Sequence, residues 1–166
     1  MDYHEIFKRL NDLKIDYLIT GGLAVNLYGI PRMTYDIDIM IKLDEKNISK
    51  IIKEILKWGY KLKIPLNPQE LMNLKKLKKL IKEKNLKAVT FYNEKEVLSQ
   101  IDIIIWSPIP YEKLKLNSKY FKILDERVPV IGIKDLIFIK SKIKRKQDKI
   151  DVENLKKILN YERKRV

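Results

Sequence analysis

The sequence predicts an α+β domain in which a small mixed sheet is flanked by helices and followed by a C-terminal helical pair. In residues 34–41, Tyr35 and three isoleucines alternate with Thr34, Asp36 and Asp38, which is the period of a strand with one buried face. Apolar residues at helical spacing mark other segments, of which residues 3–13 are the first. Strand patterns are concentrated before residue 131 and helical patterns after it, an order that favours the α+β class.

The predicted elements follow one another without an internal repeat or a Gly/Ser linker. The strands at 88–92 and 97–106 are expected to form a hairpin around residues 93–95. We expect helices at residues 3–13, 23–28, 47–58, 69–84, 134–142 and 152–165. We expect strands at residues 15–20, 34–41, 60–64, 88–92 and 97–106, and one or two short strands within 121–130.

A chain of 166 residues is expected to form one domain, here a core at residues 1–132 with a helical extension at residues 133–166 packed on it. No apolar run approaches the roughly 18 residues of a membrane span. The first five residues carry acids and lack the basic-then-apolar pattern of a secretion signal. These features predict a cytoplasmic protein without a membrane partner.

The composition limits the kinds of metal site. The chain has no cysteine and a single histidine, His4, so thiolate sites and multi-histidine sites are excluded. Any metal must be held by carboxylates, which are the ligands that Mg²⁺ and Mn²⁺ prefer.

The formal net charge of +14 and the isoelectric point near 9.7 favour phosphate-rich partners, including nucleic acid. The positive charge is mostly lysine, however, and a composition rich in lysine and isoleucine also fits an AT-rich genome or a thermophile. The lysine-dense helix at 69–84 fits a solvated face better than a nucleic-acid groove. The charge therefore supports an RNA partner without establishing one.

Chemistry is concentrated between residues 20 and 38. Gly21 and Gly22 stand between a strand and a helix, where backbone N–H groups can approach a ligand closely and the helix start favours a phosphate. Asp36 and Asp38 are two residues apart on a strand, so their carboxylates share a face and repel unless a cation neutralises them. A divalent metal ion is the usual solution.

A third acid, Asp102, interrupts the apolar run of residues 101–106, and an acid in such a run needs a partner. If its strand lies beside that of Asp36 and Asp38, three carboxylates surround the phosphate site. Such an arrangement suits two-metal phosphoryl transfer, in which metal ions stabilise the attacking and leaving oxygens.

This order of Gly21-Gly22, Asp36-Ile37-Asp38 and a later Asp102 resembles the DNA polymerase β-like nucleotidyltransferase superfamily. The amino-acid sequence of residues 21–38 is similar to its abortive-infection (AbiEii-like) toxin branch. The resemblance implies the nucleotidyltransferase fold. It also implies that a helix lysine matching Lys140 contacts the triphosphate and that a basic-Asp-x-x-Asp segment follows. Many superfamily members have serine where this chain has Gly22. The resemblance assigns catalysis and metal binding to Asp36, Asp38 and Asp102, and nucleotide binding to Thr20, Gly21, Gly22, Arg32, Thr34, Lys140, Arg145 and Asp148.

The function expected from these residues is metal-dependent transfer of a nucleotide from a nucleoside triphosphate to an acceptor. A tRNA or other RNA end fits the charge and the toxin-like branch, and a protein hydroxyl or a small molecule fits the same chemistry. The alternative is a non-catalytic nucleotide- or RNA-binding module of the same fold, or the inert partner of a toxin pair, so a cognate partner protein is also considered. Single residues also allow a purely structural interpretation: Lys140 on a solvated helix face, Asp151 as a helix cap, and Trp106 in core and interface packing.

Overall fold

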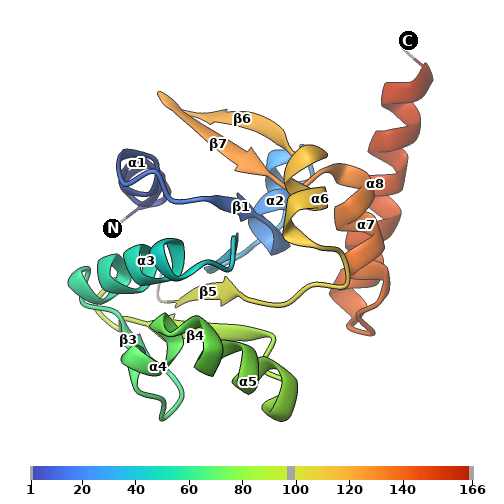
Figure 1. The fold of residues 1–166 in the computed structure, drawn as a ribbon. Helices are drawn as coiled ribbons and strands as arrows, with labels where there is room; N and C mark the ends of the chain where they lie inside the picture. The colour runs from blue at the N-terminus through green and yellow to red at the C-terminus, as the bar shows by residue number, and fades with distance from the viewer. Residues whose placement is uncertain (1, 97–99, 165–166) are drawn as a thin grey trace.

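A seven-stranded mixed sheet runs through the molecule in the order β3-β4-β5-β2-β1-β7-β6 (Figure 1). The computed structural model describes residues 2–96 and 100–164. The strands are β1 (Tyr17–Ile19), β2 (Asp36–Ile41), β3 (Lys61–Leu62), β4 (Ala88–Tyr92), β5 (Gln100–Ile104), β6 (Lys119–Ile123) and β7 (Glu126–Val130). The predicted fold class is confirmed, with strands before residue 131 and two helices after it.

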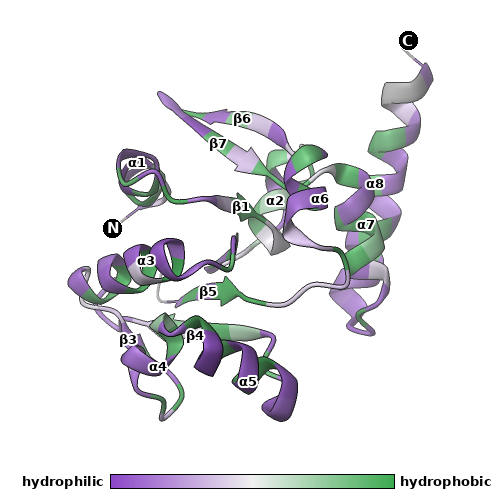
Figure 2. Ribbon diagram, in the orientation of Figure 1, coloured by the Kyte–Doolittle hydropathy of each residue, from purple (hydrophilic) through white to green (hydrophobic). Residues whose placement is uncertain are grey.

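Helices cover the sheet on both sides. In Figure 1, α1 and α3 lie on the opposite side of the molecule from α7 and α8. The helices are α1 (Tyr3–Asp12), α2 (Gly21–Leu27), α3 (Glu45–Lys57), α4 (Pro68–Met72), α5 (Leu74–Lys84), α6 (Tyr111–Leu116), α7 (Ile133–Ser141) and α8 (Lys146–Lys164). Figure 2 shows that apolar residues gather on the central strands, whereas the outer surfaces of α5 and α8 are largely polar.

The alternation predicted for β2 separates a core face from a polar face. Ile37 and Ile39 are fully buried, and Asp38 between them belongs to the opposite face of the sheet, as does Asp36 before them. β5 repeats the pattern, with Ile101 and Ile103 in the core and Asp102 between them. Because β2 and β5 pair in parallel, with Ile37 opposite Ile101, both core faces join a single hydrophobic layer.

Several boundaries differ from those predicted. The helix expected at 69–84 is two helices, because the side chain of Asn73 accepts a hydrogen bond from the Lys76 N–H and starts α5 there. Helix α6 has no counterpart among the predicted elements. The last helix begins at Lys146 rather than after Asp151, so Asp151 is inside α8 and does not cap it. Of the predicted elements, residues 97–99 and Arg165 lie outside the described residues.

No helix in the described part of the chain is long and apolar enough to cross a membrane.

Helices α7 and α8 pack against each other, and Leu136 and Leu155, one from each helix, are fully buried in the same core as the sheet residues. The division into a core at 1–132 and an extension at 133–166 stays a prediction, which unfolding experiments can test.

We expect Leu155→Ala to destabilise the whole protein by about 2–5 kcal/mol, because it removes buried methyl groups and leaves a cavity between α8 and the sheet domain. If the extension belongs to the same cooperative unit, thermal unfolding followed by circular dichroism will show one transition that shifts as a whole. Lys156→Ala, at an exposed position of the same helix, is the control and should change stability by less than about 0.5 kcal/mol. A separate early transition in Leu155→Ala would show that the helical pair unfolds independently.

Candidate active site

Asp36, Asp38 and Asp102 lie on one face of the sheet at adjacent strands. The parallel register of β2 and β5 places Asp38 directly beside Asp102, and Asp36 is one pleat earlier on β2. All three residues line a cleft of about 380 Å³ between the sheet and the α7–α8 pair, together with Gly21 and Gly22. The structure therefore brings together the three acids and the glycine turn that the sequence analysis singled out.

Gly21 and Gly22, the first two residues of α2, which we call the glycine turn, make room for the carboxylate of Asp38. Gly21 has φ +61, and a Cβ there would lie 1.7 Å from Oδ2 of Asp38, so a side chain at this position is excluded. The backbone N–H of Gly22 donates a hydrogen bond to the Asp38 carboxylate. A Cβ on Gly22 would lie 2.7 Å from Oγ1 of Thr34 and close to the Arg32 guanidinium, so a larger residue here would require Thr34 or Arg32 to move.

Asp38 is electrostatically strained. Burial, and after it the neighbouring charges of Asp36 and Asp102, raise its pKa to about 6. The Gly22 N–H and the ammonium of Lys140 act in the opposite direction. A carboxylate with so much unfavourable interaction gains most when a cation comes between it and its neighbours.

The three carboxylates suit a divalent metal, but their oxygen atoms do not all lie within 4.8 Å of one another. Oδ1 of Asp102 is buried and has no hydrogen-bond partner, which is costly unless a cation or a ligand contacts it. Oδ1 of Asp36 accepts a hydrogen bond from the Thr34 hydroxyl at 2.7 Å. Within residues 2–96 and 100–164, the three-residue group whose ligand atoms all lie within 4.8 Å is instead His4, Asp125 and Glu126, at α1 and the β6–β7 turn. The chemistry of the donor set fits Mg²⁺ or Mn²⁺.

A buried ion-pair network borders the acids. The Lys140 ammonium lies 2.8 Å from Oδ1 of Asp148 and 2.8 Å from Oδ2 of Asp151, and all three residues are at most 4% exposed. Nη1 of Arg32 lies 2.7 Å from Asp151, and Nε of Arg145 lies 2.7 Å from Asp148. These cations hold the pKa of both carboxyls below the usual range, against the opposing effect of burial.

This network, which we call the α7–α8 ion cluster, changes how the sequence-predicted residues are placed. Lys140 lines the cleft, as expected for a phosphate ligand, but two carboxylates hold its ammonium. Asp148 faces Lys140 and Arg145 and is almost fully buried. The helix cap considered for Asp151 is wrong, because its i+3 spacing from Asp148 places both acids on one face of a helix that starts at Lys146.

The rest of the cleft is largely apolar. Core and interface packing was the expectation for Trp106; its side chain is 44% exposed, so it is not a core residue, and it lies at the cleft with the Lys87 ammonium 4.8 Å from its ring centroid. No sequence pattern indicates directly that Lys87 and Trp106 lie at the cleft, because strand β5 ends before Trp106 and a Pro-containing segment follows. The other apolar lining residues are Met40, Ala88, Ile104, Pro108, Leu136, Ile139 and Ile143.

Fold and site together define a nucleotidyltransferase-type protein, with a glycine turn, an Asp-x-Asp strand and a third Asp on the parallel neighbour. The family model for aminoglycoside-2''-adenylyltransferase matches residues 2–155. The chain therefore belongs to the aminoglycoside-2''-adenylyltransferase family and is a nucleotidyltransferase. Nucleotidyltransferases of this kind generally use divalent metal ions.

Solved structures share the fold at low sequence identity. The lincosamide antibiotic adenylyltransferase LnuA, bound to lincomycin, has a TM-score of 0.64 and 18% identity over 93% of this chain and 94% of that chain. A protein of Thermotoga maritima described as a nucleotidyltransferase has a TM-score of 0.54 and 18% identity over 95% of this chain and 90% of that chain. The antibiotic-resistance factor ANT(2'')-Ia has a TM-score of 0.55 and 11% identity over 98% of this chain and 89% of that chain. No curated protein sequence matches the chain significantly.

These comparisons confirm the nucleotidyltransferase superfamily and its activity. They do not confirm the finer resemblance to the abortive-infection branch, because the matching family model is that of an adenylyltransferase acting on an antibiotic class. The assignment also favours an enzyme over the non-catalytic alternative. The roles of the individual site residues stay predictions.

We expect Asp38→Asn to stabilise the metal-free protein by about 1–3 kcal/mol at pH 7, because a pKa raised from 3.8 to about 6 makes the charged form unfavourable. The native state then binds more protons than the unfolded state, so this cost appears as pH rises from about 4 to 6 and is constant above. The measurement is urea unfolding in EDTA at pH 4 and pH 7, with Asp12→Asn, at an exposed position, as control. A loss of stability at pH 7 would instead make Asp38 a structural ion-pair partner.

We expect Lys140→Met to destabilise the protein by about 3–5 kcal/mol, because it leaves two buried carboxylates short of one cation. Adding Asp148→Asn should restore part of that loss, and a double-mutant cycle by urea unfolding measures the coupling. Unchanged stability combined with lost nucleotide binding would show that Lys140 acts on the nucleotide alone.

Proposed function

We propose that this protein transfers AMP from ATP to a hydroxyl group of a small-molecule acceptor. The observation that carries the proposal is the parallel Asp38–Asp102 pair facing the glycine turn inside one cleft. The family name supports adenylyl transfer, and two of the similar structures are a lincosamide antibiotic adenylyltransferase and an antibiotic-resistance factor. A cleft of about 380 Å³ lies within the usual range for small ligands, roughly 300–1,000 Å³.

The proposed roles follow the placement of the side chains. Asp36 and Asp38 hold Mg²⁺ or Mn²⁺, with Asp102 completing one of the sites. When bound, the metal neutralises charge on the phosphates and makes the acceptor hydroxyl easier to deprotonate. Arg32 and Lys140 lie on the Gly21–Gly22 side of the cleft and stabilise the charge of the pyrophosphate, while the α7–α8 ion cluster fixes their side chains. Thr20, Thr34, Arg145 and Asp148 shape that end: Thr34 through Asp36, and Asp148 through Lys140 and Arg145.

Asp102 is the candidate general base. Its carboxylate lines the cleft and can accept the proton of the acceptor hydroxyl as the oxygen forms a bond to the α-phosphorus. The bond between the α-phosphorus and the β-bridging oxygen breaks, and pyrophosphate leaves toward the glycine turn. Attacking and leaving oxygens lie on opposite sides of the phosphorus, as in-line displacement requires.

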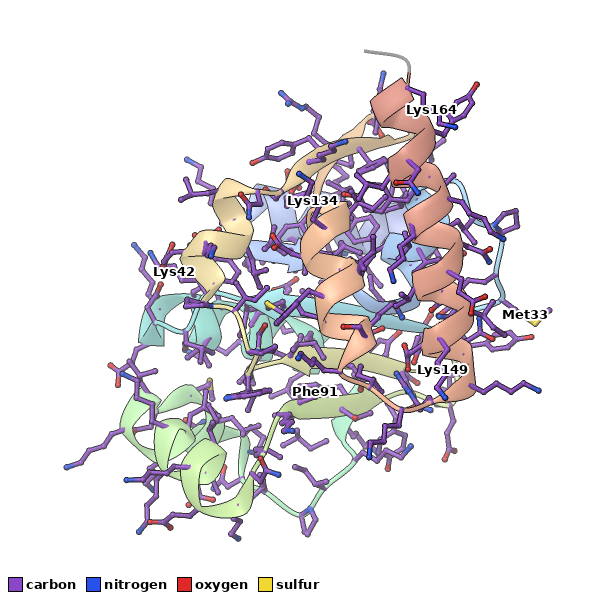
Figure 3. All side chains as sticks on the ribbon, turned by 90° about the vertical axis from the view of Figure 1, so that its right-hand side faces the viewer. Met33, Lys42, Phe91, Lys134, Lys149 and Lys164 are labelled. Carbon is purple, nitrogen blue, oxygen red and sulfur yellow. The ribbon has the colours of Figure 1, made fainter. Side chains whose placement is uncertain are left out.

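An RNA end is the acceptor expected from the charge and the toxin-like resemblance, and nothing in the family assignment supports it. A toxin role and a partner protein are likewise without support. A cleft that the α7–α8 pair borders on one side and β4 and β5 on the other suits a compact molecule better than a polymer end. Figure 3 shows this side of the molecule, with α7 and α8 in front of the sheet.

We expect label from α-³²P-ATP, but none from γ-³²P-ATP, to appear in small molecules of a cell extract, because the acceptor keeps the α-phosphate. Thin-layer chromatography of the extract, with RNA and protein fractions measured in parallel, identifies the acceptor class. Asp102→Asn should lower transfer by about 100-fold or more and spare ATP binding measured by thermal shift. Asp12→Asn is the matched control. Label found only in RNA would contradict the small-molecule acceptor, and no label despite ATP binding would contradict catalysis.

A further inference from the structure

The cleft continues past Asp102 to a wall at the end of the sheet where β4 begins and β5 ends. Lys87 immediately precedes β4, and Ala88 pairs with Ile104 in the register of the two strands. The backbone N–H groups of Ile105 and Trp106 both donate to the Lys87 carbonyl, at 3.0 and 3.2 Å. These bonds fix the two segments together and set the Lys87 ammonium over the Trp106 ring. We call Lys87, Ala88, Ile104 and Trp106 the β4–β5 wall.

The order of the strands places this wall on one side of the reaction. In the sheet, β1 leads into the glycine turn, β2 follows, then β5 and then β4. If pyrophosphate leaves toward Gly21 and Gly22, an in-line attack brings the hydroxyl from the opposite side, which is the side of Asp102 and β4. The β4–β5 wall therefore faces the acceptor, and this step depends on the proposed function.

The charges of the cleft define what the wall accepts. The carboxylates among the described lining residues are Asp36, Asp38, Asp102 and Asp148. The first three are the proposed metal ligands, and Asp148 is held by Lys140 and Arg145. No described lining carboxylate remains to pair with an ammonium group of a ligand, and Lys87 adds a positive charge beside the acceptor.

We propose that the β4–β5 wall binds an uncharged or anionic acceptor with an apolar or aromatic face and disfavours polycationic aminoglycosides. The Trp106 ring is a flat surface for an apolar ring face, and Ala88 and Ile104 extend it toward Asp102. Lys87 attracts an anionic group and repels an ammonium group. The acceptor of this chain thus differs in charge class from the compounds that the family is named for.

Trp106 provides a binding signal that does not require turnover. The chain has two tryptophans, so Trp58→Phe leaves Trp106 as the only one. In that background, with Mg²⁺ and α,β-methylene-ATP present, fluorescence can be titrated with phenyl β-D-glucoside, phenyl β-D-glucuronide and kanamycin. We expect the two phenyl glycosides to quench Trp106, and kanamycin to bind about tenfold more weakly or worse, because its ammonium groups meet Lys87 without a free carboxylate.

Charge reversal at the wall tests the same idea. Lys87→Glu should weaken the glucuronide about tenfold, strengthen kanamycin by a similar factor and leave the uncharged glucoside within about twofold. Lys134→Glu, an exposed position on α7 that does not line the cleft, makes the same change in net charge and is the control. A similar shift in both variants would reduce the effect to overall charge and overturn the role of Lys87.

The outcomes separate this inference from the proposed function. Tighter binding of kanamycin than of both phenyl glycosides, or no quenching by either glycoside, would overturn the inference. Label transfer from α-³²P-ATP to aminoglycosides in preference to uncharged acceptors would overturn it while leaving nucleotidyl transfer intact. Absence of transfer to every acceptor would count against the proposed function, whatever the fluorescence titrations show.

Discussion

Repulsion among Asp36, Asp38 and Asp102 is the constraint around which this structure is arranged. The parallel register of β2 and β5 brings two of these carboxylates side by side on a face that is partly removed from water, where the cost of like charges is high. The surrounding groups each relieve part of it: the Gly22 N–H binds Asp38, the Thr34 hydroxyl binds Asp36, and Lys140 contributes a nearby positive charge. What remains unrelieved is the carboxylate of Asp102, whose Oδ1 has no hydrogen-bond partner, and we place the acceptor and the metal at this side chain.

The α7–α8 pair supplies the positive side of this balance. Lys140 and Arg32 come from different parts of the chain, and Asp151 contacts both of them. Without the two acids of α8, three cations would face one another, and without the cations, buried carboxylates would lack partners. The C-terminal helices are therefore part of the site itself, since they determine where the cations near the glycine turn lie.

The sequence predicted that Asp36, Asp38 and Asp102 lie close together, because strand periodicity and the cost of an isolated charge leave few alternatives for their placement. It predicted the cations poorly. A lysine that faces a phosphate and a lysine buried between carboxylates have the same local pattern, so the partners of Lys140 could not be recognised. The start of α8 was missed because residues 146–149 are polar on every side and show no helical period. The position of Trp106 at the cleft could not be predicted, because its exposure depends on where β5 ends and on the backbone hydrogen bonds to Lys87.

The whole-chain charge and the charge of the cleft have different consequences. The net charge of +14 comes largely from exposed lysines, many of them on α5 and α8, and it favours the approach of any phosphate-rich molecule. That attraction acts without direct contact and is screened over about 10 Å at ordinary salt. It can therefore steer a nucleoside triphosphate toward the protein, but it cannot distinguish one acceptor from another. Choice of acceptor depends on contacts inside the cleft, where Asp148 is paired with cations, Asp36, Asp38 and Asp102 are the proposed metal ligands, and the β4–β5 wall adds one lysine and an apolar surface. A basic protein of this kind is therefore compatible with a small acceptor, and the excess charge does not by itself identify RNA as the acceptor.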